Sequence, residues 1–296
     1  MAQRPLVHLI DGPIYIFRAY YSLPAMSAPD GTPTNAAYGY ANTLIKYLTD
    51  AQVSHAAVCF DHSAESFRNE IEPGYKAQRG EPPDDLVPQF DLCTEATAAL
   101  GLPVFTREDF EADDLIATLT AQLLKKGARV VIVTTDKDLC QLVREDGRAT
   151  VYDLGRDVEL DADGVREKFG VDPAQIPDYL GLVGDAVDNL PGVPGVGAKG
   201  AGAALRTFGR IEKIPEAAEE WSGVAVRGAA GLAARIAEHR ERALLTRELA
   251  TLRYDVPGVK ADLSQLRYRG ADRLAVEDLF VRLDWGRIAT RISRWA

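Results

Sequence analysis

The most regular feature of the chain is a set of short runs in which nearly every residue is apolar. Three of them cover residues 6–10, 56–60 and 130–133. Runs of this kind are typical of strands that are buried on both faces, as in a parallel sheet with helices on each side. The segments between them have the spacing of amphipathic helices. The pattern therefore predicts an α/β fold with a doubly wound, mostly parallel sheet.

Amphipathic segments separate and follow the predicted strands. Up to residue 163, we expect helices at residues 13–21, 34–51, 84–100 and 111–126, and shorter strands at 102–105 and 149–154. Strand-like runs largely stop after residue 163, where helices are expected at 198–208 and at about 229–252. The α/β layer is therefore expected to lead into a helical part.

Residues 62–88 interrupt this alternation. They are charged and polar, and they contain Pro73-Gly74 and Pro82-Pro83. A connection of this length above the edge of a sheet is usually functional or disordered. It mixes cationic and aromatic side chains that could contact single-stranded backbone and stacked bases, namely Phe67, Arg68, Tyr75, Lys76 and Arg79. A solvated surface loop is the alternative interpretation.

An aspartate follows each of the three long apolar runs. Asp11 and Asp61 come directly after the first two runs, and Asp136 follows the third after two threonines. Because ligands of parallel sheets bind beyond the carboxyl ends of the strands, these side chains are expected to meet at one edge. With the acids near the start of the helix at 111–126 and after residue 183, the candidates are Asp11, Asp61, Glu111, Asp113, Asp114, Asp136, Asp138, Asp185 and Asp188.

Carboxylates gathered in this way repel one another unless they take up protons or bind cations. Mg²⁺ prefers oxygen ligands and keeps several waters, which suits a loose ring of acids without histidine or thiolate. Sites with two such ions stabilise in-line displacement at phosphorus. The acids together predict a magnesium site for phosphate chemistry. Each acid alone has a simpler interpretation, since acids also cap helices and complement helix dipoles.

Composition limits the class of protein. The 296 residues can form one large domain or two smaller ones. Without any long apolar run, 46% hydrophobic and 26% charged residues indicate a soluble protein. The amino terminus runs almost straight into the first predicted strand and leaves no room for an export signal, so we expect a cytoplasmic protein. The widely spaced Cys59, Cys93 and Cys140 predict buried free thiols.

The net charge of −10 argues at first against a nucleic-acid partner. Without the nine candidate acids, however, the 44 Asp and Glu residues become 35, against 34 Lys and Arg. The rest of the molecule is therefore close to neutral, and a local basic surface is compatible with the composition.

Residues 190–199 are rich in glycine and proline. In Val193-Pro194-Gly195-Val196-Gly197, glycines stand where a backbone must turn tightly. Exposed N–H groups before the helix at 198–208 could bind a phosphate. Close packing of two helices explains the same glycines equally well.

Taken in order, these segments resemble the 5′-nuclease (flap endonuclease) family over most of the chain. The resemblance rests on Leu9-Ile10-Asp11-Gly12, Phe60-Asp61, Phe67-Arg68, Glu111-Ala112-Asp113-Asp114 and residues 75–79, 135–142 and 184–197. It implies a helical arch inserted into the α/β fold and a following helical subdomain with a helix-three-turn-helix. It divides the chain into a catalytic domain at 1–163 with its arch at about 62–92, a helical subdomain at 164–260 with the helix-three-turn-helix at about 185–208, and a tail at 261–296 packed on the core.

The resemblance also implies an activity and its residues. It indicates a 5′-3′ exonuclease and 5′-flap endonuclease that hydrolyses DNA with two or more Mg²⁺ ions, for which Mn²⁺ can substitute. The nine acids would hold the metal, and Tyr75, Lys76 and Arg79 would be catalytic residues of the arch. The partner would be DNA with a 5′ flap or junction, bound by a monomer away from membranes. The residues implied in DNA binding are Arg68, Gly192, Val193, Gly195, Val196, Gly197 and Lys199.

Two features depart from the family pattern. The family often has a proline and then a threonine or serine around the hairpin lysine, where this chain has Ala198-Lys199-Gly200. A K⁺ site at the hairpin is therefore left open. The chain also ends at Ala296, with no room for polymerase or proofreading domains. It is expected to act alone or to pass its product to other repair enzymes.

Two other functions fit parts of the pattern. A phosphatase of the haloacid dehalogenase type also has an aspartate after its first strand, but it needs a second one two residues later, where this chain has Pro13. That function is rejected. A structure-specific DNA-binding protein without turnover stays open as the alternative, although the full set of acids argues against it.

Overall fold

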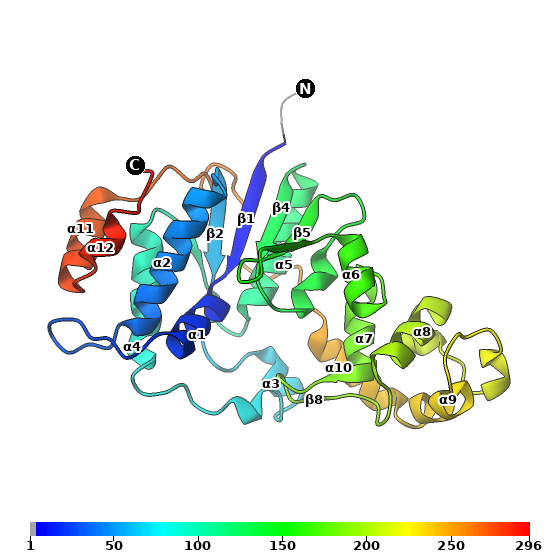
Figure 1. The fold of residues 1–296 in the computed structure, drawn as a ribbon. Helices are drawn as coiled ribbons and strands as arrows, with labels where there is room; N and C mark the ends of the chain where they lie inside the picture. The colour runs from blue at the N-terminus through cyan, green and yellow to red at the C-terminus, as the bar shows by residue number, and fades with distance from the viewer. Residues whose placement is uncertain (1–3) are drawn as a thin grey trace.

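The computed structural model describes residues 4–296. Its centre is a six-stranded sheet in the order β3-β2-β1-β4-β5-β6. The first five strands are parallel and β6 is antiparallel to β5, which confirms the mostly parallel sheet (Figure 1). The strands are β1 (Leu6–Asp11), β2 (His55–Cys59), β3 (Val104–Phe105), β4 (Arg129–Val133), β5 (Ala149–Asp153) and β6 (Val158–Leu160).

Helices cover both faces of the sheet, as the continuous apolar runs predicted. On one face, α5 (Ala112–Lys125) shares a hydrophobic core with Val7 and Leu9 of β1. On the other face, α1 (Gly12–Ser22), α2 (Asn35–Asp50) and α4 (Val87–Ala99) share a core with Ile10 and Val58. Side chains of a strand alternate between its faces, so the neighbours Leu9 and Ile10 enter different cores.

The insertion between β2 and α4 is only partly helical. It contains α3 (Phe67–Ile71) and the short 3-10 helix η1 (Ala77–Arg79), with turns between them. Pro73 and Gly74 separate the two helices, and the proline pair at 82–83 precedes α4. Prolines and glycines oppose a continuous helix, so the insertion is less helical than the expected arch.

The helical part follows β6 in the chain, and one short 3-10 helix, η2 (Asp138–Leu142), lies earlier, between β4 and β5. The helical part includes α6 (Ala162–Phe169), η3 (Pro173–Gln175), α7 (Ile176–Val183), α8 (Ala198–Phe208), η4 (Ile211–Lys213), η5 (Ala218–Trp221), α9 (Ala229–Glu238) and α10 (Arg240–Ala250), and a two-stranded ribbon of β7 (Gly184–Asp185) and β8 (Leu190–Pro191). The single helix expected at 229–252 is in fact two helices that meet at His239. Glycine at position 181 lets α7 approach α10 closely, since a Cβ there would lie 2.6 Å from the Ala243 carbonyl oxygen.

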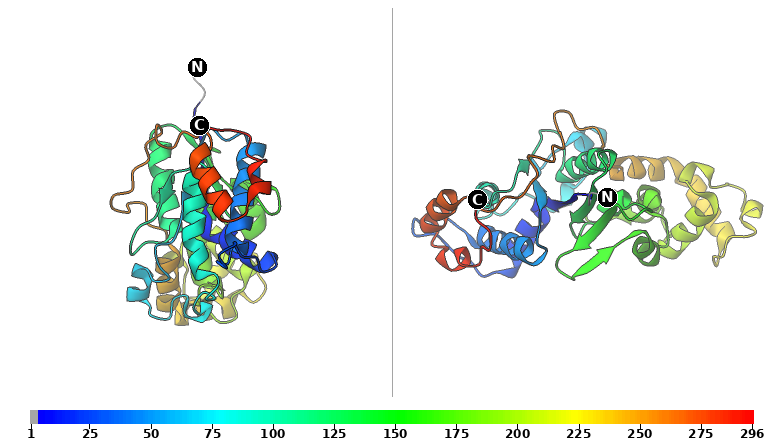
Figure 2. Two further views of the ribbon diagram at one scale, coloured as in Figure 1. Left: turned by 90° about the vertical axis from the view of Figure 1, so that its left-hand side faces the viewer. Right: turned by 90° about the horizontal axis from the view of Figure 1, so that it is seen from above.

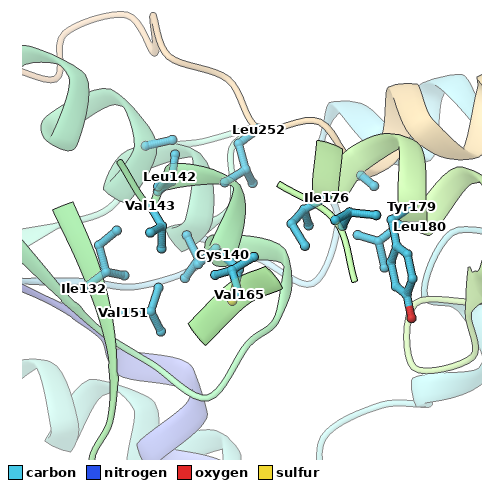
Figure 3. Close-up of a cluster of buried hydrophobic side chains, with 14 of the residues drawn as sticks. Ile132, Cys140, Leu142, Val143, Val151, Val165, Ile176, Tyr179, Leu180 and Leu252 are labelled. Carbon is cyan, nitrogen blue, oxygen red and sulfur yellow. The ribbon is translucent and has the colours of Figure 1, made fainter. Parts of the chain in front are cut away.

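One hydrophobic cluster joins the sheet to the helical part. Figure 3 shows Ile132 and Val151 of the sheet near Cys140 of η2, with Ile176 and Leu180 of α7 beyond them. This continuous core explains how β4, which carries part of the candidate site, is held against the helices that follow it. Cys59, Cys93 and Cys140 are buried free cysteines, which confirms that expectation.

The last helices pack at the opposite end of the sheet. The helices α11 (Arg273–Arg282) and α12 (Gly286–Ala289) lie beside α2 and α4, away from α8 and α9 (Figures 1 and 2). Within residues 4–296, the structure has no helix both long and apolar enough to cross a membrane. Residues 1–3, on which the expected lack of an export signal partly rests, lie outside the described residues.

Candidate active site

The parallel strands place the first acids at one edge of the sheet. Asp11 ends β1, Asp61 follows β2, and Asp136 follows β4. Thr134 links two of these strand ends, because its Oγ1 donates to Asp11 Oδ2 at 2.7 Å and accepts from the Asp136 backbone N–H at 2.9 Å. Asp11 is buried, whereas Asp61 lies at the solvent-exposed rim.

The amino terminus of α5 brings a second strip of acids to the same edge. Asp61 Oδ1 accepts a hydrogen bond from the Ala112 backbone N–H at 2.8 Å, so the end of β2 and the start of α5 are tied together. Glu111 is the N-cap of this helix, and Asp113 lies in its first turn. Acids are favourable at a helix amino terminus, which helps to gather them in this place.

The acids at this edge destabilise one another as anions. Burial raises the pKa of Asp11 to about 7, and the charges of Asp136 and Asp61 act in the same direction. Burial, followed by the charges of Asp136 and Asp11, raises the pKa of Asp113 well above its usual range. These mutual effects indicate that Asp11, Asp61, Asp113 and Asp136 face a common space that favours a bound cation.

A second group of acids lies between η2 and the β7–β8 ribbon. Carboxylate oxygens of Asp138, Asp185 and Asp188 all lie within 4.8 Å of one another, and all three residues are buried. Asp138 Oδ1 is buried without any hydrogen-bond partner. An unsatisfied carboxylate oxygen beside two other buried carboxylates suits a hard divalent cation such as Mg²⁺.

Three basic side chains besides Arg68 contact the acids directly. Lys76 Nζ donates to Glu111 Oε2 at 2.9 Å, Lys137 Nζ donates to Asp185 Oδ2 at 2.5 Å, and Arg79 is paired with Asp188. Burial alone would raise the pKa of Glu111, but the charges of Lys76 and Arg68 outweigh it and lower that pKa to about 2.

The insertion is held over the second group of acids. The Lys76 backbone N–H donates to the Asp188 carbonyl at 3.0 Å, and Asn189 donates to the Gly74 carbonyl at 2.7 Å. The buried Tyr75 hydroxyl lies 3.2 Å from Glu111 Oε2 and 3.3 Å from Asp188 Oδ2. Tyr75, Lys76 and Arg79 therefore face the acids, and their expected catalytic role stays a prediction.

Arg68 and Asp114 occupy a position that differs from the expected one. Arg68 is 1% exposed and Asp114 is 0% exposed. The guanidinium makes two hydrogen bonds to the Asp114 carboxylate, at 2.7 and 2.9 Å, and its Nε donates to the Leu249 carbonyl at 2.7 Å. The expectations that Arg68 contacts DNA and that Asp114 binds metal are therefore corrected. The two side chains form a buried ion pair between the insertion and α5, and the bond from Arg68 to the Leu249 carbonyl joins both to the end of α10.

The glycine-rich hairpin is exposed only in part. Val193 and Val196 are buried, and their backbone N–H groups donate to the Leu182 and Val193 carbonyls at 2.8 and 3.0 Å. Their expected contact with DNA through the backbone stays a prediction. Gly192 packs against the α7 end, where a Cβ would lie 2.3 Å from the Val183 carbonyl carbon, and its absent side chain thus serves packing. Gly195, Gly197 and Lys199 are exposed at the start of α8. These three positions are accessible, and their expected contact with phosphate stays a prediction.

Two residues at the acids were missed in the sequence. Ser66 Oγ donates to Glu111 Oε1 at 3.0 Å, and no motif marks it. Lys137 stands between Asp136 and Asp138, and this position alone could have identified it. A hollow of about 210 Å³ borders Asp136 and is lined by Arg156 and Lys168. A larger one, of about 520 Å³, lies along α10 and touches none of the nine acids.

Mg²⁺ should stabilise the folded protein. At millimolar Mg²⁺ and constant ionic strength, the melting temperature is expected to rise by about 5 °C or more, because a cation that binds only the folded state stabilises it by mass action. In EDTA, the melting temperature should instead rise as pH falls below about 7. The pKa of Asp11 is raised in the folded protein, so its carboxylate binds a proton more tightly in the folded state than in the unfolded state. Thermal scans with Mg²⁺ or equivalent Na⁺ measure both effects. A melting temperature indifferent to Mg²⁺ would contradict a preformed cation site.

Comparison with known proteins covers nearly the whole chain. A protein-family model described as "5′-3′ exonuclease, N-terminal resolvase-like domain" matches residues 6–170. A second family model, described as "5′-3′ exonuclease, C-terminal SAM fold", matches residues 171–274. The chain is 43% identical over 264 residues to DNA polymerase I of Pseudomonas aeruginosa, covering 86% of this chain and 28% of that protein. It is 36% identical over 295 residues to DNA polymerase I of Bacillus subtilis, covering 99% of this chain and 33% of that protein. It thus spans about a third of the length of these relatives.

Solved structures share the fold. The flap endonuclease of bacteriophage T5, in a pseudo-enzyme-product complex with DNA and metal ions, superposes with a TM-score of 0.67 at 20% identity, covering 96% of this chain and 99% of that one. The catalytic core of Rad2 in complex with DNA substrate has a TM-score of 0.63 at 16% identity, covering 97% and 92%. At these identities, the similarity concerns the fold alone.

Proposed function

The chain belongs to the 5′-3′ exonuclease family, and from this premise we propose that it hydrolyses DNA phosphodiester bonds near junctions between a 5′ single strand and a duplex. The reaction would need two or more Mg²⁺ ions, with Mn²⁺ as a substitute. The observation that carries the proposal is the group Asp138, Asp185 and Asp188, whose buried carboxylates converge around an oxygen without a partner. Membership of the family agrees with the resemblance of the motifs.

The metal would be held by two sets of acids. The set at the sheet edge is Asp11, Asp61, Glu111, Asp113 and Asp136, and the set at the β7–β8 ribbon is Asp138, Asp185 and Asp188. Bound divalent ions neutralise charge on the phosphoryl oxygens during such a displacement. Asp114 would act through its ion pair with Arg68 and not as a ligand.

The remaining residues would bind and orient the DNA. When DNA binds, Lys76 would leave Glu111 and Arg79 would leave Asp188, and both would contact the scissile phosphate. Tyr75 would keep the insertion close to the acids. The attack of water would form a new oxygen–phosphorus bond and break the bond to the 3′ oxygen. The products would be a 5′-phosphate and a 3′-hydroxyl. Recovery of a covalent protein–DNA intermediate would contradict this course.

The division of labour proposed for the chain follows the same contacts. Residues 1–163, with the insertion at about 62–92, would carry the chemistry, and residues 164–260 would hold duplex DNA through the helix-three-turn-helix at about 185–208. Gly195, Gly197 and Lys199 would contact backbone phosphates without reading sequence. A monomer is sufficient for this arrangement.

A labelled 5′-flap duplex, incubated with Mg²⁺ or with EDTA, tests the function. Cleavage near the junction in Mg²⁺ alone is expected. Binding of the duplex without a Mg²⁺-dependent product would favour the alternative, a structure-specific DNA-binding protein without turnover.

Two lysines should separate chemistry from binding. Lys76→Ala is expected to lower the single-turnover cleavage rate by roughly 100-fold, because a charge beside the reacting phosphate is lost where it stabilises the transition state. Lys199→Ala is expected to weaken DNA binding and to reduce the slope of log affinity against log salt by about 0.9, the value for one phosphate contact. Single-turnover kinetics and salt titrations of binding measure these effects. The reverse assignment in the two assays would refute the division.

A further inference from the structure

Lys137 lies inside the second group of acids without a role assigned by the sequence motifs. Its Nζ is 2.5 Å from Asp185 Oδ2 and 3.7 Å from Asp138 Oδ1. The oxygen at 3.7 Å is the one that has no hydrogen-bond partner. The ammonium therefore satisfies Asp185 but only approaches Asp138.

The backbone around Lys137 is fixed, while its side chain can move. The Asp138 backbone N–H donates to Asp136 Oδ1 at 2.8 Å, and the Asp136 backbone N–H donates to Thr134, so the turn that carries the lysine is braced on both sides. The Lys137 side chain is 32% exposed, in contrast to 9% for Asp138 and 6% for Asp185. A rotation about its side-chain bonds can carry the ammonium into solvent without moving the acids.

The lysine carries its charge at neutral pH. Lysine side chains are ordinarily protonated at neutral pH, and the Lys137 ammonium lies beside the Asp138 and Asp185 carboxylates. A charged ammonium and a divalent cation repel each other at short range, so both cannot approach the same carboxylate oxygens closely.

We propose that Lys137 is a built-in competitor for the cation bound by Asp138, Asp185 and Asp188. This inference rests on the proposed function, because it assumes that these acids bind the metal. Lys137 holds Asp185 in place while no cation is bound, and it must leave Asp185 when one binds. It is a positioning residue that sets how much divalent cation is needed to fill this part of the site.

The change in cation affinity on removing Lys137 distinguishes competition from structural support. A lysine that merely supports the structure would, when removed, weaken cation binding. A lysine that competes would, when removed, strengthen it. Lys137→Met keeps most of the side-chain length and removes the charge. It is expected to tighten Mn²⁺ binding by roughly fivefold, as expected from removal of one partly exposed ion pair.

Loss of a positive charge anywhere nearby also favours cations, so a matched control is needed. Lys168 lines the hollow beside Asp136, and within residues 4–296 it forms no ion pair closer than 4.0 Å. Lys168→Met therefore removes a nearby charge without breaking an ion pair, and the only contact it is known to lose among residues 4–296 is that of the ammonium with the Phe169 ring, 5.0 Å from the ring centroid. Its effect should fade at high salt, whereas the effect of Lys137→Met should persist, because a direct contact is screened much less than a distant one.

The experiment measures Mn²⁺ binding to the full chain without DNA, by isothermal titration and by the electron paramagnetic resonance of free Mn²⁺. Tighter binding by Lys137→Met at both low and high salt, with wild-type binding by Lys137→Arg, is the expected result. If Lys137→Met does not fold, Lys137→Gln keeps a donor for Asp185 and tests the same point. Equal or weaker binding by these uncharged variants would overturn this inference alone. Absence of Mn²⁺ binding by the wild type would overturn both this inference and the metal dependence of the proposed function.

Discussion

Asp185→Asn is expected to lower flap cleavage at millimolar Mg²⁺ by about 100-fold or more, a loss of roughly 2.7 kcal/mol of transition-state stabilisation. Asp185 is buried, and its two oxygens accept from the Val187 backbone N–H and from Lys137. The asparagine keeps the size and the backbone hydrogen bond but removes one negative charge from the second group of acids. Fewer charges hold the cation less tightly and position it less well for the displacement.

A rate measurement with excess protein over DNA separates this effect from weaker DNA binding. Asp278→Asn is the matched control, because Asp278 is exposed on α11, which packs beside α2 and α4 at the end of the sheet away from α8 and α9. That variant should cleave like the wild type. Partial rescue of Asp185→Asn by higher Mg²⁺ would support a ligand role. Wild-type cleavage by Asp185→Asn at low Mg²⁺ would show that the site lies elsewhere.

The sheet could be predicted because its signal is local. A strand covered on both faces must be apolar at nearly every position, so residues 6–10, 56–60 and 130–133 could be identified without any knowledge of the partners they pack against. The strand order then brings the residues that follow these runs to one edge. Asp11, Asp61 and Asp136 were therefore placed together correctly, although their binding of metal stays a proposal.

The roles of Arg68 and Asp114 could not be predicted in the same way. Their spacing looks like that of the other basic and acidic residues, and both are buried by tertiary contacts, including those with the end of α10 and with Arg253. Asp114 points away from Asp113 because consecutive helical residues lie about 100° apart on the helix. A pairing between residues 46 positions apart depends on the tertiary fold and leaves no local pattern.

The break between α9 and α10 and the contact of Lys137 also depend on tertiary structure. Alanine, arginine and leucine favour helix throughout residues 229–252, so propensity alone predicts one helix. The backbone at His239 turns out of the helical conformation so that α10 can pack against α7. Lys137 was visible between two candidate ligands, but only the β7–β8 ribbon brings Asp185 to it.

Arg68→Met is expected to lower the free energy of unfolding by about 3–5 kcal/mol, the usual cost of breaking a buried ion pair by removing one partner. The variant would leave the Asp114 carboxylate buried without its guanidinium and would also remove the bond to the Leu249 carbonyl. Urea unfolding followed by circular dichroism measures the change. Arg242→Met is the matched control, because Arg242 also ties the insertion to α10, through Glu72 at 2.8 Å, but its side chain is 43% exposed. An exposed pair of this kind should contribute no more than about 1 kcal/mol.

A second substitution separates the loss of charge balance from the loss of packing. In the double variant Arg68→Met, Asp114→Asn, no unpaired charge is buried, and the asparagine oxygen can still accept from the Arg253 backbone N–H, which lies 2.8 Å from Asp114 Oδ1. The double variant should therefore be more stable than Arg68→Met alone, which is the sign of direct coupling between the two residues. If Arg68→Met kept wild-type stability and lost only affinity for DNA, the buried ion pair would not hold the insertion in place. Arg68 would then have to be exposed to DNA, as the motif first suggested.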